Sequence, residues 1–363
     1  MFASRASRPV VISAIILAVI ILFSLSPYSP TPSQITDQIS SLPALSSKSA
    51  PIPNIVHYVI LKKDEQSLLH LKFEHFLSIY ASLIYFKPTT IFLHTDHNAS
   101  TIKNAAASGD KWTRKILNLP GVKTNQVVSP IDANGTLIAK VEHKSDFVRI
   151  NELYRTGGIY LDLDVLPLRD IKLLRNAGYR SVVGRQLHGG INNGVIMAQK
   201  GSALVYLMQR EGPLVFNGGW ETHSIKLITP IAERLVKIPG EVLIMDEKAF
   251  SPTSWREDST DYLFAPHNET SIPDIEQDVE EVEQDDPIAL WESRNSKTRK
   301  WEADFSATYL LHAYKGRGHD VPGFHGVTVP YVLKKDSNYA LAAYPVVRHA
   351  LDNGVIDEVD DEV

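Results

Sequence analysis

Apolar residues first gather into one long uncharged run near the start of the chain. Residues 10–25 (VVISAIILAVIILFSL) contain no charged side chain and follow Arg5 and Arg8. At about 1.5 Å per residue, a helix over this run is short for a bilayer but can span one that thins locally. We therefore expect a transmembrane signal anchor at 10–25, a cytosolic tail at 1–9 and a lumenal body. A cleaved signal peptide is the competing interpretation.

The pattern changes after this run. Residues 26–51 are rich in Ser and Pro and lack apolar periodicity, which is typical of a flexible stem. A globular domain is expected over 52–350. Two acidic segments are expected to be solvated: the loop 273–287, where residues 274–286 hold eight acids and no base, and the tail 351–363.

Within the globular part, short apolar runs alternate with helical patterns. The helical spacing predicts helices over 72–85, 145–155 and 225–236. This alternation predicts an α/β domain with a mainly parallel sheet. The apolar runs that predict buried strands are residues 55–60, 90–94, 122–128, 159–161, 179–184 and 308–311.

The densest chemistry surrounds the strand predicted at 159–161. Ser145 is a suitable N-cap for the preceding helix, and Gly157–Gly158 stops it. Asp162 and Asp164 follow the strand, and within a regular strand their side chains would share one face. Two such carboxylates are costly to bury unless they are neutralised, and oxygen-binding cations such as Mg²⁺ and Mn²⁺ do this.

The helix adds a second charged pair. Asp146 and Arg149 lie three residues apart, so they share a helix face and can reach the same pocket. The forked donors of Arg suit phosphate or sugar oxygens. A surface turn beside an intrahelical Asp146–Arg149 pair is the alternative interpretation.

Together these residues resemble the DxD sugar-binding region of glycosyltransferase family 32. That family includes fungal Golgi mannosyltransferases and animal α-1,4-galactosyl- and α-1,4-N-acetylglucosaminyltransferases, and related regions occur in glucosylating bacterial toxins. The resemblance is strong over residues 143–170 and weaker across 50–320. The matching residues are Ser145, Asp146, Arg149, Leu153, Gly157, Gly158, Tyr160, Asp162 and Asp164.

The resemblance implies a GT-A-like fold, with a Rossmann-like, mainly parallel sheet flanked by helices behind a transmembrane helix. It implies a metal-dependent, retaining transfer of a hexose in the Golgi. The donor would be GDP-mannose, UDP-galactose or UDP-N-acetylglucosamine, and the acceptor a glycan or glycolipid. No residue stands out as a covalent nucleophile, so direct front-face attack by the acceptor hydroxyl is preferred.

The resemblance also implies roles for individual residues. Asp162, Asp164 and His312 would hold Mn²⁺ or Mg²⁺, with Asp164 the more direct ligand. Asp146 and Arg149 would orient the sugar and act in catalysis with Asp162 and Asp164. The residues implied to bind the nucleotide-sugar donor are Asp146, Arg149, Tyr160, Asp162, Asn193 and His312.

Two of these residues lie in later segments with weaker similarity. Residues 189–198 (GGINNGVIMA) predict a tight turn beside a strand and resemble a family segment that would place Asn193 near the ligand. Residues 306–314 (SATYLLHAY) place His312 at the end of a predicted strand, where an imidazole can ligate Mn²⁺. Without the resemblance, a turn and a structural histidine are the ordinary interpretations.

A third segment carries an aromatic candidate. Trp220 precedes the helix predicted over 225–236, and its indole could stack on the face of a sugar or be buried in the core. Glu221 and His223 are polar enough to contact an acceptor.

Composition narrows the choice of function. The chain of 363 residues has no cysteine, which excludes disulfides, thiol nucleophiles and Cys-ligated zinc. Its net charge of −5 gives no reason to expect nucleic acid as a partner. Sequons at Asn98, Asn134 and Asn268 are consistent with a lumenal glycoprotein.

Two other interpretations remain open. A hydrophobic strand followed by DxDVL also matches the nucleophile motif of haloacid-dehalogenase-type phosphatases, in which Asp162 would be phosphorylated and Asp164 would act as acid/base. That motif normally opens its domain, whereas here a long α/β stretch precedes it. A membrane-tethered, carbohydrate-binding pseudoenzyme is the non-enzymatic alternative.

Overall fold

The computed structural model describes residues 50–268, 299–314 and 319–362. The expected cytosolic tail 1–9, the anchor 10–25, most of the stem 26–51 and the acidic loop 273–287 lie outside these described residues. Among the residues described, no helix is both long and apolar enough to cross a membrane.

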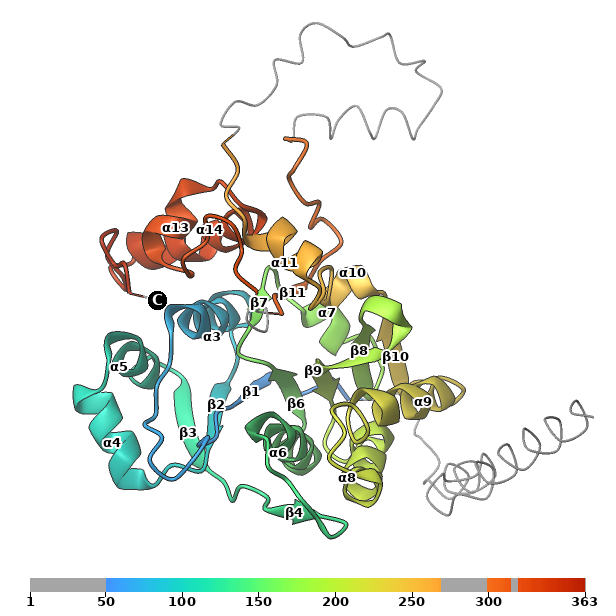
Figure 1. Cartoon of the computed structure of the whole chain (residues 1–363). Coiled ribbons are helices and arrows are strands. Elements are labelled where there is room, and N and C mark those ends of the chain that lie inside the picture. The colour runs from blue at the N-terminus through green and yellow to red at the C-terminus, as the bar shows by residue number, and fades with distance from the viewer. Residues whose placement is uncertain (1–49, 269–298, 315–318, 363) are drawn as a thin grey trace, which may run out of the picture. The chain divides into compact units, whose positions relative to one another are not determined.

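A seven-stranded sheet forms the centre of the described chain (Figure 1), with the strand order β10-β8-β9-β6-β1-β2-β3. Neighbouring strands are parallel except at β9, which runs antiparallel to both β6 and β8. The predicted α/β class with a mainly parallel sheet is confirmed. Its strands are β1 (Ile55–Val59), β2 (Thr90–Thr95), β3 (Val122–Gln126), β6 (Gly158–Leu161), β8 (Ser181–Arg185), β9 (Ile191–Ala198) and β10 (Val242–Met245).

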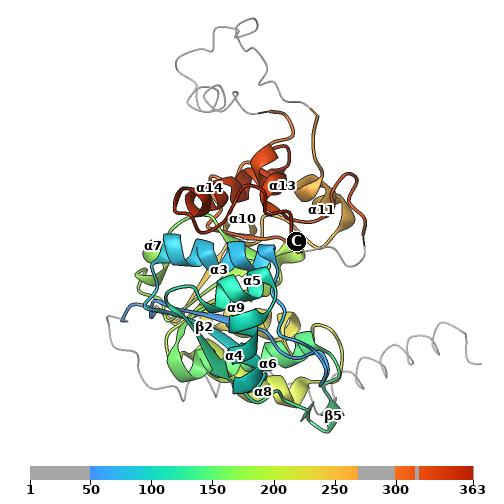
Figure 2. The same cartoon turned by 90° about the vertical axis from the view of Figure 1, so that its left-hand side faces the viewer.

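Helices cover both faces of this sheet. The helices α6 (Val141–Thr156), α8 (Ala203–Val215) and α9 (Ile225–Leu235) lie on one face, and α3 (Phe73–Phe86) lies on the other (Figures 1 and 2). At the β3 edge lie α4 (Ala99–Ser108) and α5 (Lys111–Leu117). The helix α3 is amphipathic, and its buried side contributes Phe73, Phe76 and Leu77 to the main core.

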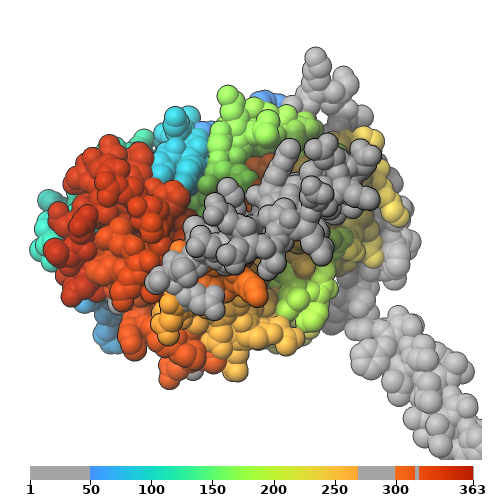
Figure 3. Space-filling model, turned by 90° about the horizontal axis from the view of Figure 1, so that it is seen from above, coloured from blue at the N-terminus to red at the C-terminus, as the bar shows by residue number. Residues whose placement is uncertain are grey.

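The remaining elements are short or belong to the C-terminal part. In Figure 3, the C-terminal helices (red) lie beside α3 (cyan). Two small antiparallel pairs join β7 to β11 and β4 to β5. These elements are β4 (Asp132–Ala133), β5 (Thr136–Leu137), β7 (Val165–Pro167), α7 (Lys172–Arg175), the 3₁₀ turn η1 (Leu187–Gly189), α10 (Glu247–Phe250), α11 (Glu257–Phe264), β11 (Leu310–His312), α13 (Val329–Lys334) and α14 (Asn338–Asp352).

The C-terminal residues contact α5 through a few buried groups, so the tail at 351–363, which was expected to be solvated, is packed in part, while most of residues 352–362 are exposed. Ile356 is 2% exposed and belongs to the main core. The buried carboxylate of Asp360 pairs with Lys111. The indole Nε1 of Trp112 donates a hydrogen bond of 3.0 Å to the backbone oxygen of Glu362. The acidic composition of the tail did not reveal these contacts, because only a few buried side chains make them.

Two local predictions also fail. The helix α6 begins at Val141 with Lys140 as its N-cap residue, so Ser145 lies inside the helix and is not a cap. The tight turn expected across residues 189–198 is confined to Gly189 and Gly190, and the two asparagines that follow lie in β9. Because β9 pairs with strands on both sides, its backbone groups gain more from the ladder than from a turn.

Candidate active site

The two carboxylates of the DxD motif converge through a turn. Asp162 and Asp164 lie between β6 and β7, not within one regular strand. The backbone N–H of Asp162 donates to the oxygen of Gly194 on β9 (2.8 Å), and that of Val165 donates to the oxygen of Asp162 (3.0 Å). The predicted convergence is present, although a hydrogen-bonded turn produces it instead of strand alternation.

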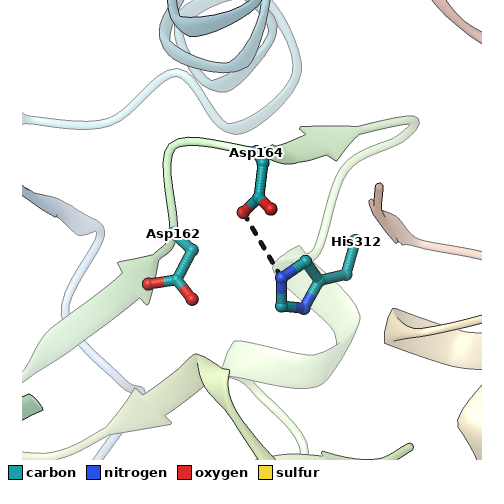
Figure 4. Close-up of side chains that lie close together, drawn as sticks. All are labelled: Asp162, Asp164 and His312. Atoms are coloured by element: carbon teal, nitrogen blue, oxygen red, sulfur yellow. Dashed lines mark ion pairs between the residues drawn. The ribbon is translucent and has the colours of Figure 1, made fainter. Parts of the chain in front are cut away.

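A strand from far along the chain brings His312 to this turn. In the antiparallel pair of β11 and β7, His312 lies opposite Val165. Its Nε2 is 3.3 Å from Oδ1 of Asp164. Figure 4 shows Asp162, Asp164 and the imidazole around one common space. Taking one ligand atom from each residue, the three atoms lie within 4.8 Å of one another.

These three residues fit a divalent metal. Two carboxylates and one imidazole are a donor set that suits Mn²⁺. Gly194 borders the same space, and a Cβ at that position would lie 2.6 Å from Oδ2 of Asp162 and 2.7 Å from Cε1 of His312. Glycine is therefore the residue that lets β9 pass this close to the proposed metal set, which is Asp162, Asp164 and His312.

The protonation states within this set are coupled. Burial raises the pKa of Asp162. Burial acts in the same direction on Asp164, but the adjacent His312 outweighs it and holds the pKa of Asp164 below its usual range. Burial acts to lower the pKa of His312, and the Asp164 carboxylate outweighs it and raises that pKa. The protein alone thus favours an imidazolium–carboxylate pair whose proton a metal ion would displace.

Arg149 holds acidic side chains in place. Its Nη2 lies 3.1 Å from Oδ1 of Asp146 and 3.2 Å from Oδ1 of Asp162. Its Nη1 donates to the backbone oxygen of Asn193 (2.8 Å), and Nε donates to that of Ser145 (3.4 Å). All three nitrogens of the guanidinium therefore contact protein groups. The sequence suggested that this fork faces phosphate or sugar oxygens, whereas the structure places it between two carboxylates.

The other donor-site residues complete this arrangement. The guanidinium carbon of Arg149 lies 4.4 Å from the ring centroid of Tyr160, whose hydroxyl donates to Oδ1 of Asp162 (2.6 Å). The amide Nδ2 of Asn193 donates to Oδ1 of Asp146 (2.8 Å). Asn193 thus fixes Asp146 directly.

The positions of His223 and Tyr314 in the site were not predicted from the sequence. His223 is 3% exposed, and its Nε2 lies 3.0 Å from Oδ2 of Asp146. The ring of Tyr314 stacks on that of His312 at 3.8 Å between centroids. A signal for Tyr314 existed, because a residue two positions after His312 shares its face in extended chain. No sequence signal linked His223 to Asp146.

The structure brings every residue of the predicted site to one cavity of about 600 Å³. This volume lies within the usual range for pockets that hold small molecules and cofactors. Two half-exposed tryptophans, Trp220 and Trp255, line the same cavity. The predicted residues that line it are Asp146, Arg149, Tyr160, Asp162, Asp164, Asn193 and His312.

Residues 54–182 match a family model described as the glycosyltransferase sugar-binding region containing the DXD motif. This part of the chain is similar to that sugar-binding region. The resemblance inferred from Asp146, Arg149, Asp162 and Asp164 is therefore confirmed, and these four residues lie inside the matched range. Asn193 and His312 of the predicted site lie beyond it.

A curated relative and several solved structures are similar to this chain. Glucan organizing enzyme 1 of Cryptococcus neoformans var. grubii serotype A (strain H99) is 27% identical over 227 residues, which are 58% of this chain and 57% of the relative. The chain thus spans a little over half the length of the curated relative that it matches.

Among solved structures, PaToxG glycosyltransferase is 16% identical with a TM-score of 0.39, over 52% of this chain and 71% of that one. GlyE of Streptococcus pneumoniae TIGR4 is 13% identical with a TM-score of 0.39, over 84% and 64%. Mouse xyloside xylosyltransferase 1 is 13% identical with a TM-score of 0.36, over 56% and 89%. Because these TM-scores are below 0.5, the fold is assigned from the strand order of the central sheet.

Proposed function

We propose that this chain is a metal-dependent, retaining hexosyltransferase that moves a sugar from a nucleotide sugar to a carbohydrate acceptor. The observation that carries the proposal is the convergence of Asp162, Asp164 and His312 in a cavity of about 600 Å³. GDP-mannose, UDP-galactose and UDP-N-acetylglucosamine are the candidate donors. A Golgi location behind an anchor at residues 10–25, with a glycan or glycolipid acceptor, completes the proposal.

The charges around the DxD turn support the need for a cation. Three carboxylates, those of Asp146, Asp162 and Asp164, have Arg149, His223 and His312 as the basic side chains close to them. A nucleoside diphosphate would add further negative charge to this set. A divalent cation held by Asp162, Asp164 and His312 would neutralise the charge that develops on the leaving diphosphate.

The protein's own residues position the donor. Arg149 holds Asp162 toward the proposed metal set and keeps Asp146 on the adjacent turn of α6. Asp146, fixed by Asn193 and His223, is placed to orient the hydroxyls of the donor sugar. The acceptor oxygen forms a bond to the anomeric carbon as the bond to the diphosphate breaks on the same face. The acceptor's proton passes to the departing phosphate oxygen, and the anomeric configuration is retained.

The first experiment follows release of UDP or GDP from a panel of nucleotide sugars by the purified protein, with Mn²⁺ and with a chelator. We expect Mn²⁺-dependent release from one donor, and Asp164→Asn should lower it by more than about 100-fold because a metal ligand is lost. Hydrolysis of phosphate esters without any use of nucleotide sugars would instead support the phosphatase alternative. Glycan binding without turnover or metal dependence would support the pseudoenzyme.

A further inference from the structure

The cavity continues along α6 beyond the residues assigned to the donor. Arg149 lies beside the DxD turn and Asp146 lies one turn earlier. His143 and Glu142 come one further turn toward the start of the helix, and both line the cavity. One helix therefore connects the proposed metal set to a second region, in which no donor role has been assigned to any residue.

Trp220 forms a fixed aromatic wall in this second region. It lies in the connection between α8 and α9, lines the cavity and is 39% exposed. The ammonium of Lys140 lies 4.6 Å from its ring centroid, and the ring of His143 lies 5.3 Å from it. These contacts hold the indole in one orientation. An aromatic surface that is already ordered loses little conformational freedom when a ligand stacks on it.

His143 leaves a polar atom without a partner at the same place. The residue is 2% exposed, yet it lines the cavity. Its Nε2 has no hydrogen-bond partner among the described residues. Burial, together with nearby His223, lowers the pKa of His143 and favours a neutral ring. Because buried polar atoms are normally paired, a hydroxyl of a ligand in the cavity would supply the partner that this atom lacks.

Near Trp255, the cavity is lined by polar side chains that form hydrogen bonds with one another. The hydroxyl of Tyr314 lies 3.2 Å from Oε1 of Gln186 and 3.3 Å from the hydroxyl of Ser251. The amide of Asn192 donates to Oε1 of Gln186 (2.6 Å). These polar side chains satisfy one another, although Nδ1 of His312, on whose ring Tyr314 stacks, also lacks a partner among the described residues.

We propose that the region formed by Glu142, His143, Trp220 and Glu221 is the acceptor subsite, and that it binds the uncharged terminal sugar of a glycan. The apolar face of the sugar would stack on Trp220. Its hydroxyls would donate to the carboxylates of Glu142 and Glu221, and one would meet Nε2 of His143. This inference rests on the proposed transferase function and names the class of its acceptor.

The charge of the cavity wall selects against acidic acceptors. Arg149, whose guanidinium lines the cavity, is already paired with two carboxylates, and the Lys140 ammonium beside Trp220 is outnumbered by the carboxylates that line the cavity. A phosphorylated or sialylated sugar would bring like charges together and bind more weakly. The carboxylates that line the cavity belong to Glu74, Glu142, Asp146, Asp162, Asp164 and Glu221.

The test uses the full-length protein with Mn²⁺ and UDP or GDP on an array of neutral, sialylated and phosphorylated glycans. We expect neutral glycans to bind, and Trp220→Ala to weaken that binding at least about tenfold. Trp220→Phe, which keeps an aromatic face, should restore most of it. Calorimetry should show an unchanged Kd for the nucleoside diphosphate in both variants. Tyr262→Ala, which removes a half-exposed aromatic ring outside the cavity, is the matched control.

Two results would overturn the inference while leaving the proposed function standing. One is Mn²⁺-dependent nucleotide release together with glycan binding that Trp220→Ala leaves unchanged. The other is selective binding of anionic glycans by the wild-type protein. Failure of the wild-type protein to release nucleotide from any donor or to bind any glycan would overturn the inference and the proposed function together.

Discussion

At the scale of single residues, the site depends on how Arg149 is used. The guanidinium is buried and lies within 3.2 Å of carboxylate oxygens from both Asp146 and Asp162. Burial opposes its charge, but Asp162 and the other nearby acidic groups raise its pKa further above its ordinary value. Arg149 therefore stays charged and lets three acidic side chains remain close together without a ligand.

Replacement of Arg149 by lysine should be costly although the charge is kept. A single ammonium cannot reproduce the contacts that the guanidinium makes with Asp146, Asp162 and Asn193. We expect nucleotide release to fall by about 10- to 100-fold and the free energy of unfolding by a few kcal/mol. Steady-state kinetics and urea unfolding measure the two effects.

The same helix offers a matched control for this substitution. Arg155 pairs with Glu152, and its side chain is 62% exposed. Glu152 is itself buried, but Arg155 contacts it from the surface and lysine keeps the charge there, so Arg155→Lys should leave nucleotide release unchanged and lower the free energy of unfolding by no more than about 1 kcal/mol. Equal effects of Arg149→Lys and Arg155→Lys would show that the contacts of Arg149 have no special role.

At the scale of elements, the start of β6 is held by a chain of buried hydrogen bonds. The amide of Asn125 donates to Nδ1 of His94, whose Nε2 lies 2.9 Å from Nδ1 of His57. Nε2 of His57 lies 2.9 Å from the oxygen of Gly157 and donates to it, because a carbonyl oxygen only accepts. Both rings are neutral in this arrangement. His57 thus has a structural role, holding the start of β6.

These histidines should make stability fall in mild acid. Burial lowers the pKa of His57 to about 4 and that of His94 to about 3, whereas an unfolded histidine has a pKa of 6.5. Between pH 6.5 and about 4 the unfolded chain binds protons that the folded chain does not, so acid favours unfolding. We expect a loss on the order of 3–4 kcal/mol between pH 7 and pH 5, measured by urea unfolding.

A variant separates this effect from other titrating groups. His57→Asn removes one of the two histidines, so the loss of stability between pH 7 and pH 5 should shrink by roughly half. His70→Asn, which replaces a histidine whose side chain is 57% exposed, should retain the full loss. A pH dependence that is unchanged in His57→Asn would contradict the interpretation.

Elements were predictable from the sequence where local pattern and packing agree. The apolar run of β6 is defined by neighbouring residues, so it was placed correctly, and Asp162 and Asp164 were correctly placed after it, although a turn and not strand alternation brings them together. The start of α6 was not, because His143 packs against the distant Phe216 and Trp220 and favours a longer helix than Ser145 suggested. The turn expected at the two asparagines of β9 is absent, because Asn192 pairs with Gly184 of β8 and Asn193 lies in the irregularity of register that follows.

At the scale of the whole molecule, contacts distant in sequence decide what sequence reasoning missed. His223 reaches Asp146 from a different helix connection, and Trp255 reaches the cavity from the segment before α11. The C-terminal segment closes against α5 through Ile356 and Asp360. None of these contacts follows from local periodicity, because each depends on where the chain returns after many residues.

The C-terminal closure should contribute measurably to stability. Ile356 is 2% exposed, so Ile356→Ala removes buried methyl groups and leaves a cavity. We expect a loss of about 2–4 kcal/mol in the free energy of unfolding. Val359→Ala is the matched control, because Val359 is 83% exposed in the same segment. Urea unfolding curves that coincide for the two variants would contradict a packed C-terminal segment.

The pairing of β11 with β7 has a consequence for the biogenesis of the protein. A growing chain has all seven strands of the main sheet once Met245 has been synthesised. The imidazole of the proposed metal set is synthesised only with His312, and β7 cannot pair with β11 before then. A nascent chain can therefore complete its sheet well before it can complete the site. Premature release from the ribosome between these two points would leave a chain with the full sheet but without the imidazole of that set.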